Sequence, residues 1–575
     1  MTEQKLKGYP SIDKPWLKYY SKETQDARMP ECTIYTYLWE NNKKNLEDVA
    51  ICYYGKKITY GKLFKKIDRV SKAFYHLGVK PGDVIIMASV TTPEMIYTLY
   101  ALNRLGAVLN MVDPRTSVDR IQEYIREANV KIVLSIDAAY QKIEQAAVGT
   151  SVRNIIVLSP LDSLPTIKKI PLRITNKLKG KSPKLKGESL IWKQFIAGED
   201  RAIHEAPYVK DACCAIIHTG GTTGTPKGVM LSNENINSSV VQGNVSGFNF
   251  QRHHKWLNIM PPFIAYGIVN GLHMPLCDGM TLIVLPQFDP KKYDKLLLKY
   301  KPNHIAGVPS HYNTVIHSKK LAHIDLSFLL SPIVGGDGTE VGFEKQVNDF
   351  LNEHNCQTNL IKGYGMTEVC ACVSVAAQKR CNKLGSVGIP LSHSQVSVFE
   401  NGKELPYGNK GEICMRGPSV MIGYYKNEKE TSTILQKHED GSVWVHSGDL
   451  GYIDEDGCVF IEGRLKRMIV RADGFKVFPK LIEDIVLTHE KVEACCVVGA
   501  PDKEHSQGEL PVAFIVLVSE FFDKETEILK ALRKLCFDNL PEYAQPIGFR
   551  VCEVLPLTAI GKIDFCTLKR IAAEI

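Results

Sequence analysis

The segment 215–232, AIIHTGGTTGTPKGVMLS, places glycines, threonines and one lysine directly after a short apolar run. Glycines let a backbone approach its ligand closely, and N–H groups and hydroxyls would surround the Lys227 ammonium. Such a loop suits an anion, and a phosphate above all. It does not match the P-loop, because Pro226 precedes the lysine, nor G-x-G-x-x-G, because Gly220 and Gly221 are adjacent. Taken alone, the segment is equally compatible with an ordinary glycine-rich turn.

Short apolar runs alternate with helical patterns around this loop. The alternation starts with VIIMAS (84–89), a helix over 92–105, VLNMVD, a helix over 118–128 and KIVLS, and it recurs over 255–285 and 304–350. This order predicts a layered α/β domain with mixed or parallel sheets. Beyond Arg464 the chain changes to a compact basic unit of helices and strands. We therefore expect a large N-terminal domain over 1–465 and a small α+β domain over 466–575.

Composition excludes several classes of protein. The chain has 575 residues, 44% hydrophobic and 23% charged, as in a soluble globular protein with more than one domain. The N-terminus lacks an apolar signal segment and no run of 18 apolar residues occurs, so the sequence predicts a cytoplasmic protein. Its 16 cysteines and 16 histidines show no C-x-x-C pair or H-E-x-x-H motif, which indicates reduced thiols and gives little support for a structural metal.

One segment accounts for the net charge of +8. Between Pro165 and Gly187 there is no acidic residue and eight basic ones: Lys168, Lys169, Arg173, Lys177, Lys179, Lys181, Lys184 and Lys186. Without them, basic and acidic residues are equal in number. The segment lacks the interleaved aromatics of a nucleic-acid binder, so we expect no nucleic-acid partner. Peripheral contact with the anionic inner face of a membrane and a solvated insertion remain as the two alternatives.

Four later motifs follow the first one in order: KGYGMTEV (362–369), VHSGDLGYIDEDG (445–457), IEGRLKRMIVRADGFKVFP (461–479) and LPLTAIGKID (555–564). Together with the loop at 215–232, they resemble the adenylate-forming superfamily of acyl-CoA synthetases, luciferases and peptide-synthetase adenylation domains. The resemblance runs from about Ile58 to Lys562. It implies two successive reactions, the formation of an acyl-AMP and the transfer of the acyl group to a thiol, with ATP, Mg²⁺ and coenzyme A as cofactors and a small carboxylic acid as substrate.

The resemblance also implies roles for individual residues. Lys562, Thr367 and Glu368 are the expected catalytic residues, with Glu368 also holding Mg²⁺, and Lys466 is the expected hinge of a mobile C-terminal domain. Nucleotide and cofactor binding falls to a larger set: Thr219, Gly220, Gly221, Thr222, Thr223, Gly224, Lys227, Asp337, Tyr364, Asp449, Arg464 and Gly474. In that set Asp449 and Arg464 would contact the ribose, and Gly474 would leave room for a pantetheine arm. Each residue taken alone is also compatible with a purely structural role, such as a partner in a surface ion pair or a turn residue.

These residue types suit the chemistry of adenylation. A carboxylic acid is already ionised at neutral pH, so its attack on the α-phosphate of ATP needs no general base. The reaction instead needs cations and backbone donors that neutralise several anionic groups and hold the attacking oxygen in line with pyrophosphate. The loop at 215–232 and Lys562 are of this kind.

The sequence favours a fatty acid as the substrate. Amino-acid-activating relatives carry an aspartate in the stretch that here is PPFIAYG (261–267), and an unpaired substrate ammonium would be costly there. The TGGTTG form of the first motif and the basic insertion resemble long-chain acyl-CoA synthetases. Ile264 stands where many relatives have His. Pro479, Lys480 and Leu481 stand where they have Pro-x-Glu, with the next acid at Glu483, and Asp337 stands where they have a small residue. A carrier protein remains as an alternative acceptor, since its phosphopantetheine presents the same thiol as CoA.

Overall fold

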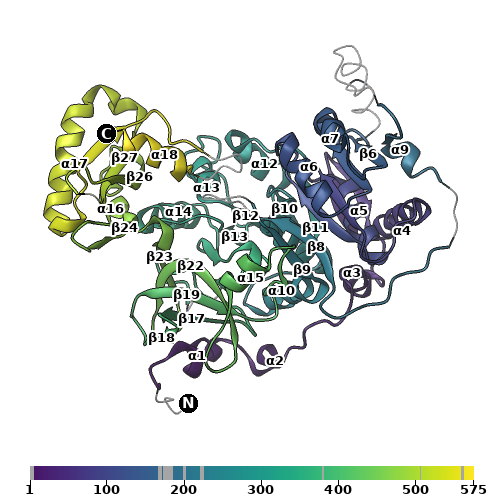
Figure 1. The fold of residues 1–575 in the computed structure, drawn as a ribbon, viewed down its shortest axis with the longest axis horizontal. Coiled ribbons are helices and arrows are strands. Elements are labelled where there is room, and N and C mark those ends of the chain that lie inside the picture. Colours follow the sequence, from purple (N-terminus) through teal and green to yellow (C-terminus); the bar gives the residue numbers. More distant parts are fainter. Residues whose placement is uncertain are drawn as a thin grey trace.

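A computed structural model describes residues 6–165, 171, 185–198, 202–219, 226–377, 381–505, 507–557 and 563–574. Figure 1 shows a large body and a smaller C-terminal unit beside it. The expected layered α/β architecture with a small α+β unit is confirmed. Gly220–Gly224, seven of the eight basic residues of the 165–187 segment, and Lys562 lie outside the described residues. Within the described part of the chain, no helix has the length and apolar character needed to cross a membrane.

The first large sheet carries the glycine-rich segment. Its strand order is β20-β9-β8-β4-β3-β5-β6-β7. The strands are β3 (Val84–Ala88), β4 (Val108–Val112), β5 (Ile132–Ile136), β6 (Asn154–Leu158), β7 (Leu190–Ile191), β8 (Cys213–His218), β9 (Gly228–Ser232) and β20 (Gly423–Tyr424). Strands β3 to β8 pair in parallel, whereas β9 returns antiparallel to β8. The segment between β8 and β9 therefore leaves and re-enters the same end of this sheet.

Helices cover both faces of that sheet, because alternate strand residues point to opposite sides. Ile85 and Met87 pack with α4 (Tyr60–His76) and α5 (Pro93–Arg104), while Ile86 and Ala88 pack with α6 (Val118–Glu127) and α7 (Tyr140–Ala147). The helices predicted over 92–105 and 118–128 thus form α5 and α6. Helices α3 (Ile34–Asn42), α10 (Asn233–Val245) and α11 (Met274–Cys277) complete the layer on the α5 side.

The second large sheet packs on the other side of this shared helical layer. Its order is β16-β15-β14-β13-β12-β10-β11-β1-β2. The strands are β1 (Val49–Tyr53), β2 (Lys56–Thr59), β10 (Lys255–Asn258), β11 (Thr281–Val284), β12 (His304–Gly307), β13 (Ser331–Val334), β14 (Ile361–Tyr364), β15 (Ser374–Val375) and β16 (Ile389–Pro390). Its outer face packs on α12 (Tyr293–Tyr300), α13 (Pro309–Ile316) and α14 (Val341–Glu353).

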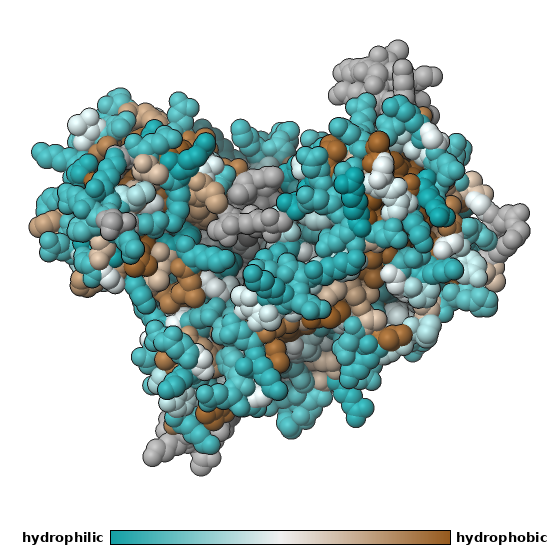
Figure 2. Space-filling view, viewed as in Figure 1, coloured by the Kyte–Doolittle hydropathy of each residue, from teal (hydrophilic) through white to brown (hydrophobic). Residues whose placement is uncertain are grey.

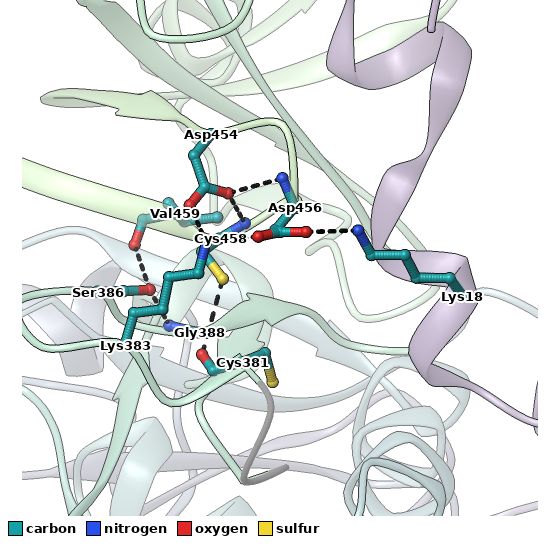
Figure 3. Close-up of polar contacts among 9 residues, drawn as sticks. All are labelled: Lys18, Cys381, Lys383, Ser386, Gly388, Asp454, Asp456, Cys458 and Val459. Atoms are coloured by element: carbon teal, nitrogen blue, oxygen red, sulfur yellow. Dashed lines mark hydrogen bonds and ion pairs between the residues drawn. The ribbon is translucent and has the colours of Figure 1, made fainter. Parts of the chain in front are cut away.

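A third, antiparallel sheet follows and carries Asp449 and Arg464, the two residues expected to contact a ribose. Its strands are β17 (Gln395–Glu400), β18 (Lys403–Glu404), β19 (Gly411–Arg416), β21 (Leu435–Lys437), β22 (Val443–Ile453) and β23 (Val459–Arg464). Side-chain ion pairs hold the turn between β22 and β23 (Figure 3). The Lys383 ammonium lies 2.6 Å from Asp454 and 2.7 Å from Asp456, and the Lys18 ammonium lies 2.6 Å from Asp456. The N-terminal segment thereby braces the hairpin that carries Asp449 and Arg464.

The C-terminal unit has its own cores. It contains β24 (Ile469–Val470), β25 (Lys476–Val477), α16 (Pro479–Val486), β26 (Val492–Pro501), β27 (Glu509–Leu517), α17 (Glu525–Asn539), β28 (Gly548–Val551) and α18 (Phe565–Ala573). Val497 and Ile515 pack against α16 and α17, whereas Phe514 on the opposite face packs against α18. The unit therefore has hydrophobic cores that are separate from those of the large body.

Candidate active site

A cleft of about 2920 Å³ runs between the large body and the C-terminal unit. Nine of the expected site residues line it: Thr219, Lys227, Asp337, Tyr364, Thr367, Glu368, Asp449, Arg464 and Lys466. They come from the two large sheets, the third sheet and the segment that follows it. The face of the molecule in Figure 2 is mostly hydrophilic, with scattered hydrophobic patches.

The two ends of the glycine-rich segment are held together. The backbone N–H of Thr219 donates to the Lys227 carbonyl over 2.9 Å, and the Lys227 N–H donates to Thr219 Oγ1 over 3.0 Å. The Lys227 ammonium pairs with Glu430 and lies 4.9 Å from the centre of the Tyr424 ring. This closure fixes where the segment leaves the sheet and leaves one cation at the edge of the cleft.

Glu368 lies on the one-turn helix η5 (Thr367–Val369), directly after strand β14. Its side chain is buried, and the Tyr424 hydroxyl donates to its Oε1 over 2.6 Å. Burial raises the pKa of Glu368, against the opposing effect of this hydrogen bond. Thr367 lines the cleft beside it. A cation bound next to this buried carboxyl would lower its pKa and favour the ionised carboxylate.

Asp449 is held from two sides, by the expected cofactor-binding residue Tyr364 and by Arg464, the other expected ribose residue. The Tyr364 hydroxyl donates to Asp449 Oδ2 over 2.6 Å, and Arg464 Nε lies 2.8 Å from Oδ1. Asp449 and Arg464 are paired residues of β22 and β23, so the sheet register places them side by side. Arg464 Nη1 also donates to the Ser447 carbonyl over 3.1 Å. The carboxylate is thus oriented before any ligand binds.

The C-terminal unit contacts the large body next to the expected adenine loop. Lys480 on α16 lies 3.4 Å from Glu340 and 3.2 Å from Asp484. Burial and the neighbouring Asp484 raise the pKa of Glu340 to about 8. Asp337, three residues earlier, is exposed and accepts a hydrogen bond from the Gly338 N–H over 2.9 Å. Lys480, the middle residue of the Pro479-Lys480-Leu481 stretch, thus joins the two units through a contact of its ammonium with Glu340.

The structure separates Gly474 from the other expected residues. Gly474 has a φ of +85°, lies in an exposed turn and does not line the cleft. In contrast, Leu557 and Ile563, which flank the segment that contains Lys562, pair with each other and both line the cleft. The described residues on either side of 558–562 therefore lie on the cleft, whereas the Gly474 turn does not.

Sequence reasoning missed several residues of the site. Tyr424 donates a hydrogen bond to Glu368, which lies 56 positions away in the sequence. The Ser447 carbonyl accepts from Arg464, and Glu340 accepts from Lys480, 140 positions away. The only local signal was their proximity to motifs, as with Ser447 two residues before Asp449. Such contacts arise when sheets pack together, and local spacing does not encode them.

Apolar side chains line a further part of the cleft. They are Phe248, Phe250, Trp256, Ile259, Met260, Phe263, Ile264, Met274, Leu285 and Phe288. The π-helix η3 (Tyr266–His273) adds Tyr266 and Asn270. Asn270 Oδ1 is buried and has no hydrogen-bond partner among the described residues. This region therefore suits a mainly apolar ligand group.

Sequence comparisons relate the chain to known enzymes. The model of the AMP-binding enzyme family matches residues 38–425, and that of its C-terminal domain matches 481–562. A long-chain-fatty-acid–CoA ligase of Bacillus subtilis is 28% identical over 96% of both chains. A probable 4-coumarate–CoA ligase 1 of Dictyostelium discoideum is 31% identical over 86% of this chain and 87% of its own.

Solved structures have the same architecture. The ATP-bound RpMatB-BxBclM chimera B1 superposes with a TM-score of 0.82 at 25% identity, covering 95% of this chain and all of its own. The anthranilate CoA ligase AuaEII superposes with a TM-score of 0.81 at 19% identity over 95% of this chain and 98% of its own. Two family models that follow one another along most of the sequence leave one conclusion: the chain belongs to the AMP-binding enzyme family.

Proposed function

We propose a medium- to long-chain fatty acid as the substrate of this protein, which is an AMP-forming acid–CoA ligase. The apolar lining of the cleft carries the proposal, because burial of an alkyl chain contributes about 0.8 kcal/mol per methylene. Ile264 adds apolar surface where a histidine would be polar. The end-to-end similarity to a long-chain-fatty-acid–CoA ligase supports the same acid class.

In the proposed first half-reaction, a carboxylate oxygen of the acid attacks the α-phosphorus of ATP and pyrophosphate leaves. The glycine-rich loop with Lys227 would hold the β- and γ-phosphates, and Thr367 the α-phosphate. Lys562 would donate to the charge that develops in the transition state. Asp449 and Arg464 would fix the ribose, while Tyr364 and Asp337 would border the adenine.

A magnesium ion fits beside Glu368. The site offers one buried carboxylate, and Tyr424 occupies only one of its oxygens. Mg²⁺ is commonly held by one or two carboxylates together with substrate phosphates. When bound, the ion would neutralise phosphate charge. The chain's own contribution would be to hold the carboxylate in place through the Tyr424 hydroxyl.

In the proposed second half-reaction, the CoA thiolate attacks the acyl carbonyl carbon and AMP leaves. We propose that residues 466–575 rotate about Lys466, removing Lys562 and bringing Gly474 to the cleft. The present arrangement supports the first half of this cycle, since the segments flanking Lys562 line the cleft and Gly474 does not. A glycine at 474 would let the pantetheine arm pass close to the backbone.

One observation favours a second class of acid. The buried Asn270 Oδ1 lies in the apolar region and has no hydrogen-bond partner within the described part of the chain, and a hydroxyl on the substrate would satisfy it. Relatives named as 4-coumarate–CoA ligases are 26% and 31% identical to this chain, close to the 28% of the long-chain-fatty-acid–CoA ligase. A hydroxylated aromatic acid is therefore the alternative substrate, and a carrier-protein phosphopantetheine is the alternative acceptor.

A panel of acids tests the proposal. CoA-dependent AMP formation would be measured with saturated acids of graded length, with hydroxycinnamic acids, and with CoA or pantetheinylated carrier protein as acceptor. The proposal expects kcat/KM to rise with chain length to a maximum in the medium- to long-chain range. A maximum with a hydroxycinnamic acid would contradict it and favour the alternative.

We also propose that residues 165–187 keep the enzyme at an anionic membrane face, where fatty acids partition. The support is the charge of the segment alone: each basic residue near such a surface contributes about 1 kcal/mol. Co-sedimentation with anionic vesicles should then weaken as salt rises. Binding that ignores salt, or no binding, would defeat this proposal and leave the ligase activity unaffected.

A further inference from the structure

Three side chains of types that can bind a metal meet on the third sheet. Glu412 Oε2 lies 2.7 Å from His446 Nδ1, and Cys414 Sγ lies 3.5 Å from the same nitrogen. All three donor atoms lie within 4.8 Å of one another. We call Glu412, Cys414 and His446 the β19–β22 donor cluster.

Strand register brings this cluster together. Cys414 and His446 are directly paired residues of the antiparallel strands β19 and β22, and Glu412 lies two residues before Cys414 on the same face. The opposite face carries Ile413, Met415 and Val445, which pack into a hydrophobic core. The donor cluster therefore lies on the face of the sheet opposite that core.

We propose that the β19–β22 donor cluster binds one Zn²⁺ ion. Thiolate, imidazole and carboxylate form a donor set that suits zinc, whereas Mg²⁺ prefers oxygen ligands, so this site is chemically separate from Glu368. Tetrahedral zinc places its nitrogen and sulfur ligands about 3.5 Å apart, which is the separation of Cys414 Sγ and His446 Nδ1. Glu412 has only to draw back by roughly half an ångström.

The surroundings supply outer contacts and an open side. His438 Nε2 lies 3.0 Å from His446 Nε2. With the metal on His446 Nδ1, the His446 Nε2–H group would donate a hydrogen bond to His438 Nε2. Glu412 Oε1 accepts the Gly448 N–H over 2.9 Å, which orients the carboxylate. Cys414 is fully buried, while the side chains of His446 and Glu412 are 10% and 23% exposed. Water from the cleft would supply the fourth ligand on that exposed side.

Zinc binding at this site releases one proton, from Cys414. The Cys414 S–H bond breaks, its electron pair forms the bond to zinc and its proton goes to solvent. The proton of His446 moves from Nδ1 to Nε2, and that of His438 from Nε2 to Nδ1, so neither imidazole changes charge. No electron is transferred.

Metal analysis of the full chain tests this site. Wild-type protein and three variants would be kept in a non-thiol reductant, dialysed with Zn²⁺ or Co²⁺ and freed of loose metal. Cys414→Ala removes the thiolate. Glu412→Gln removes the carboxylate charge but still accepts the Gly448 N–H, so its fold should persist. Cys356→Ala is the matched control, because Cys356 is buried in the large body outside the cluster.

The expected result is one more zinc per chain in wild type and Cys356→Ala than in Cys414→Ala. Cobalt should give a thiolate charge-transfer band in the first two only, and Glu412→Gln should bind zinc at least tenfold more weakly than wild type. Zinc content that is equal in wild type and Cys414→Ala, a cobalt spectrum without the thiolate band, or an unchanged affinity in Glu412→Gln would each overturn the proposal. Circular dichroism checks the fold of every variant.

Discussion

Tyr364 and Asp449 belong to different sheets and lie 85 positions apart, yet the Tyr364 hydroxyl donates to Asp449 Oδ2 over 2.6 Å. The contact joins the end of β14 to β22. Burial, and then the charge of Asp449, raise the pKa of the Tyr364 phenol, so it stays a donor at neutral pH. One carboxylate oxygen is thereby oriented by the second sheet and the other by Arg464.

Asp449→Asn should raise KM for ATP. The substitution weakens the contacts to Arg464 and to the ribose, and charge-assisted hydrogen bonds contribute about 1.5–3 kcal/mol, or roughly 10- to 100-fold. Because ribose contacts hold ground and transition states alike, kcat should change much less. Steady-state kinetics with varied ATP measures both. Asp440→Asn, on an exposed turn, is the control. An unchanged KM would remove Asp449 from the nucleotide site.

The sequence singled out Asp449 and Arg464 but did not predict the contacts that the neighbouring segments make. Asp449 and Arg464 lie in motifs, and alternation of apolar runs predicted α5, α6 and the strands around them. In contrast, the contacts of Tyr424 with Glu368 and of Lys480 with Glu340 join segments that meet only when sheets and domains pack. The β19–β22 donor cluster escaped for the same reason, since 32 positions separate Cys414 from His446 and no short metal motif spans them.

Lys562→Ala should abolish adenylation and largely spare the second half-reaction. Loss of a preorganised donor at a developing charge costs about a hundredfold or more. Pyrophosphate exchange measures the first step, and CoA consumption from supplied acyl-AMP measures the second. Lys534→Ala, on the exposed face of α17, is the matched control. An equal loss in both half-reactions would contradict domain rotation.

Lys480→Met should shift the balance between the two half-reactions. Its ammonium contacts Glu340 and so joins the C-terminal unit to the large body in the arrangement in which Leu557 and Ile563 line the cleft. Loss of a half-buried pair of about 1 kcal/mol should lower the adenylation rate roughly fivefold without slowing thioester formation from acyl-AMP. Lys530→Met, on exposed α17, controls for the lost charge. If both rates fall together, the contact does not favour one domain arrangement.

Glu94→Gln should stabilise the protein at high pH. Burial raises the pKa of Glu94 to about 7 from 4.5, even though Ser163 Oγ donates to it over 2.5 Å. The folded chain holds a proton that the unfolded chain releases, so wild-type stability falls as pH rises from about 4.5 to 7.

The glutamine variant lacks this loss and should gain up to about 3 kcal/mol in free energy of unfolding above pH 7, with no gain below pH 4.5. Denaturant unfolding across this pH range measures the difference. Glu353→Gln, at an exposed site on α14, should show none of it. Parallel stability curves for wild type and Glu94→Gln would refute the assignment.

Oxygen-18 transfer tests the acyl-adenylate pathway most directly. A fatty acid labelled in both carboxylate oxygens would be incubated with the enzyme, ATP, magnesium and CoA, and the products analysed by mass spectrometry. Attack of the carboxylate on the α-phosphorus predicts AMP with one ¹⁸O atom, acyl-CoA with one, and unlabelled pyrophosphate. Unlabelled AMP together with ¹⁸O in pyrophosphate or phosphate would place the attack on another phosphorus and contradict adenylate formation.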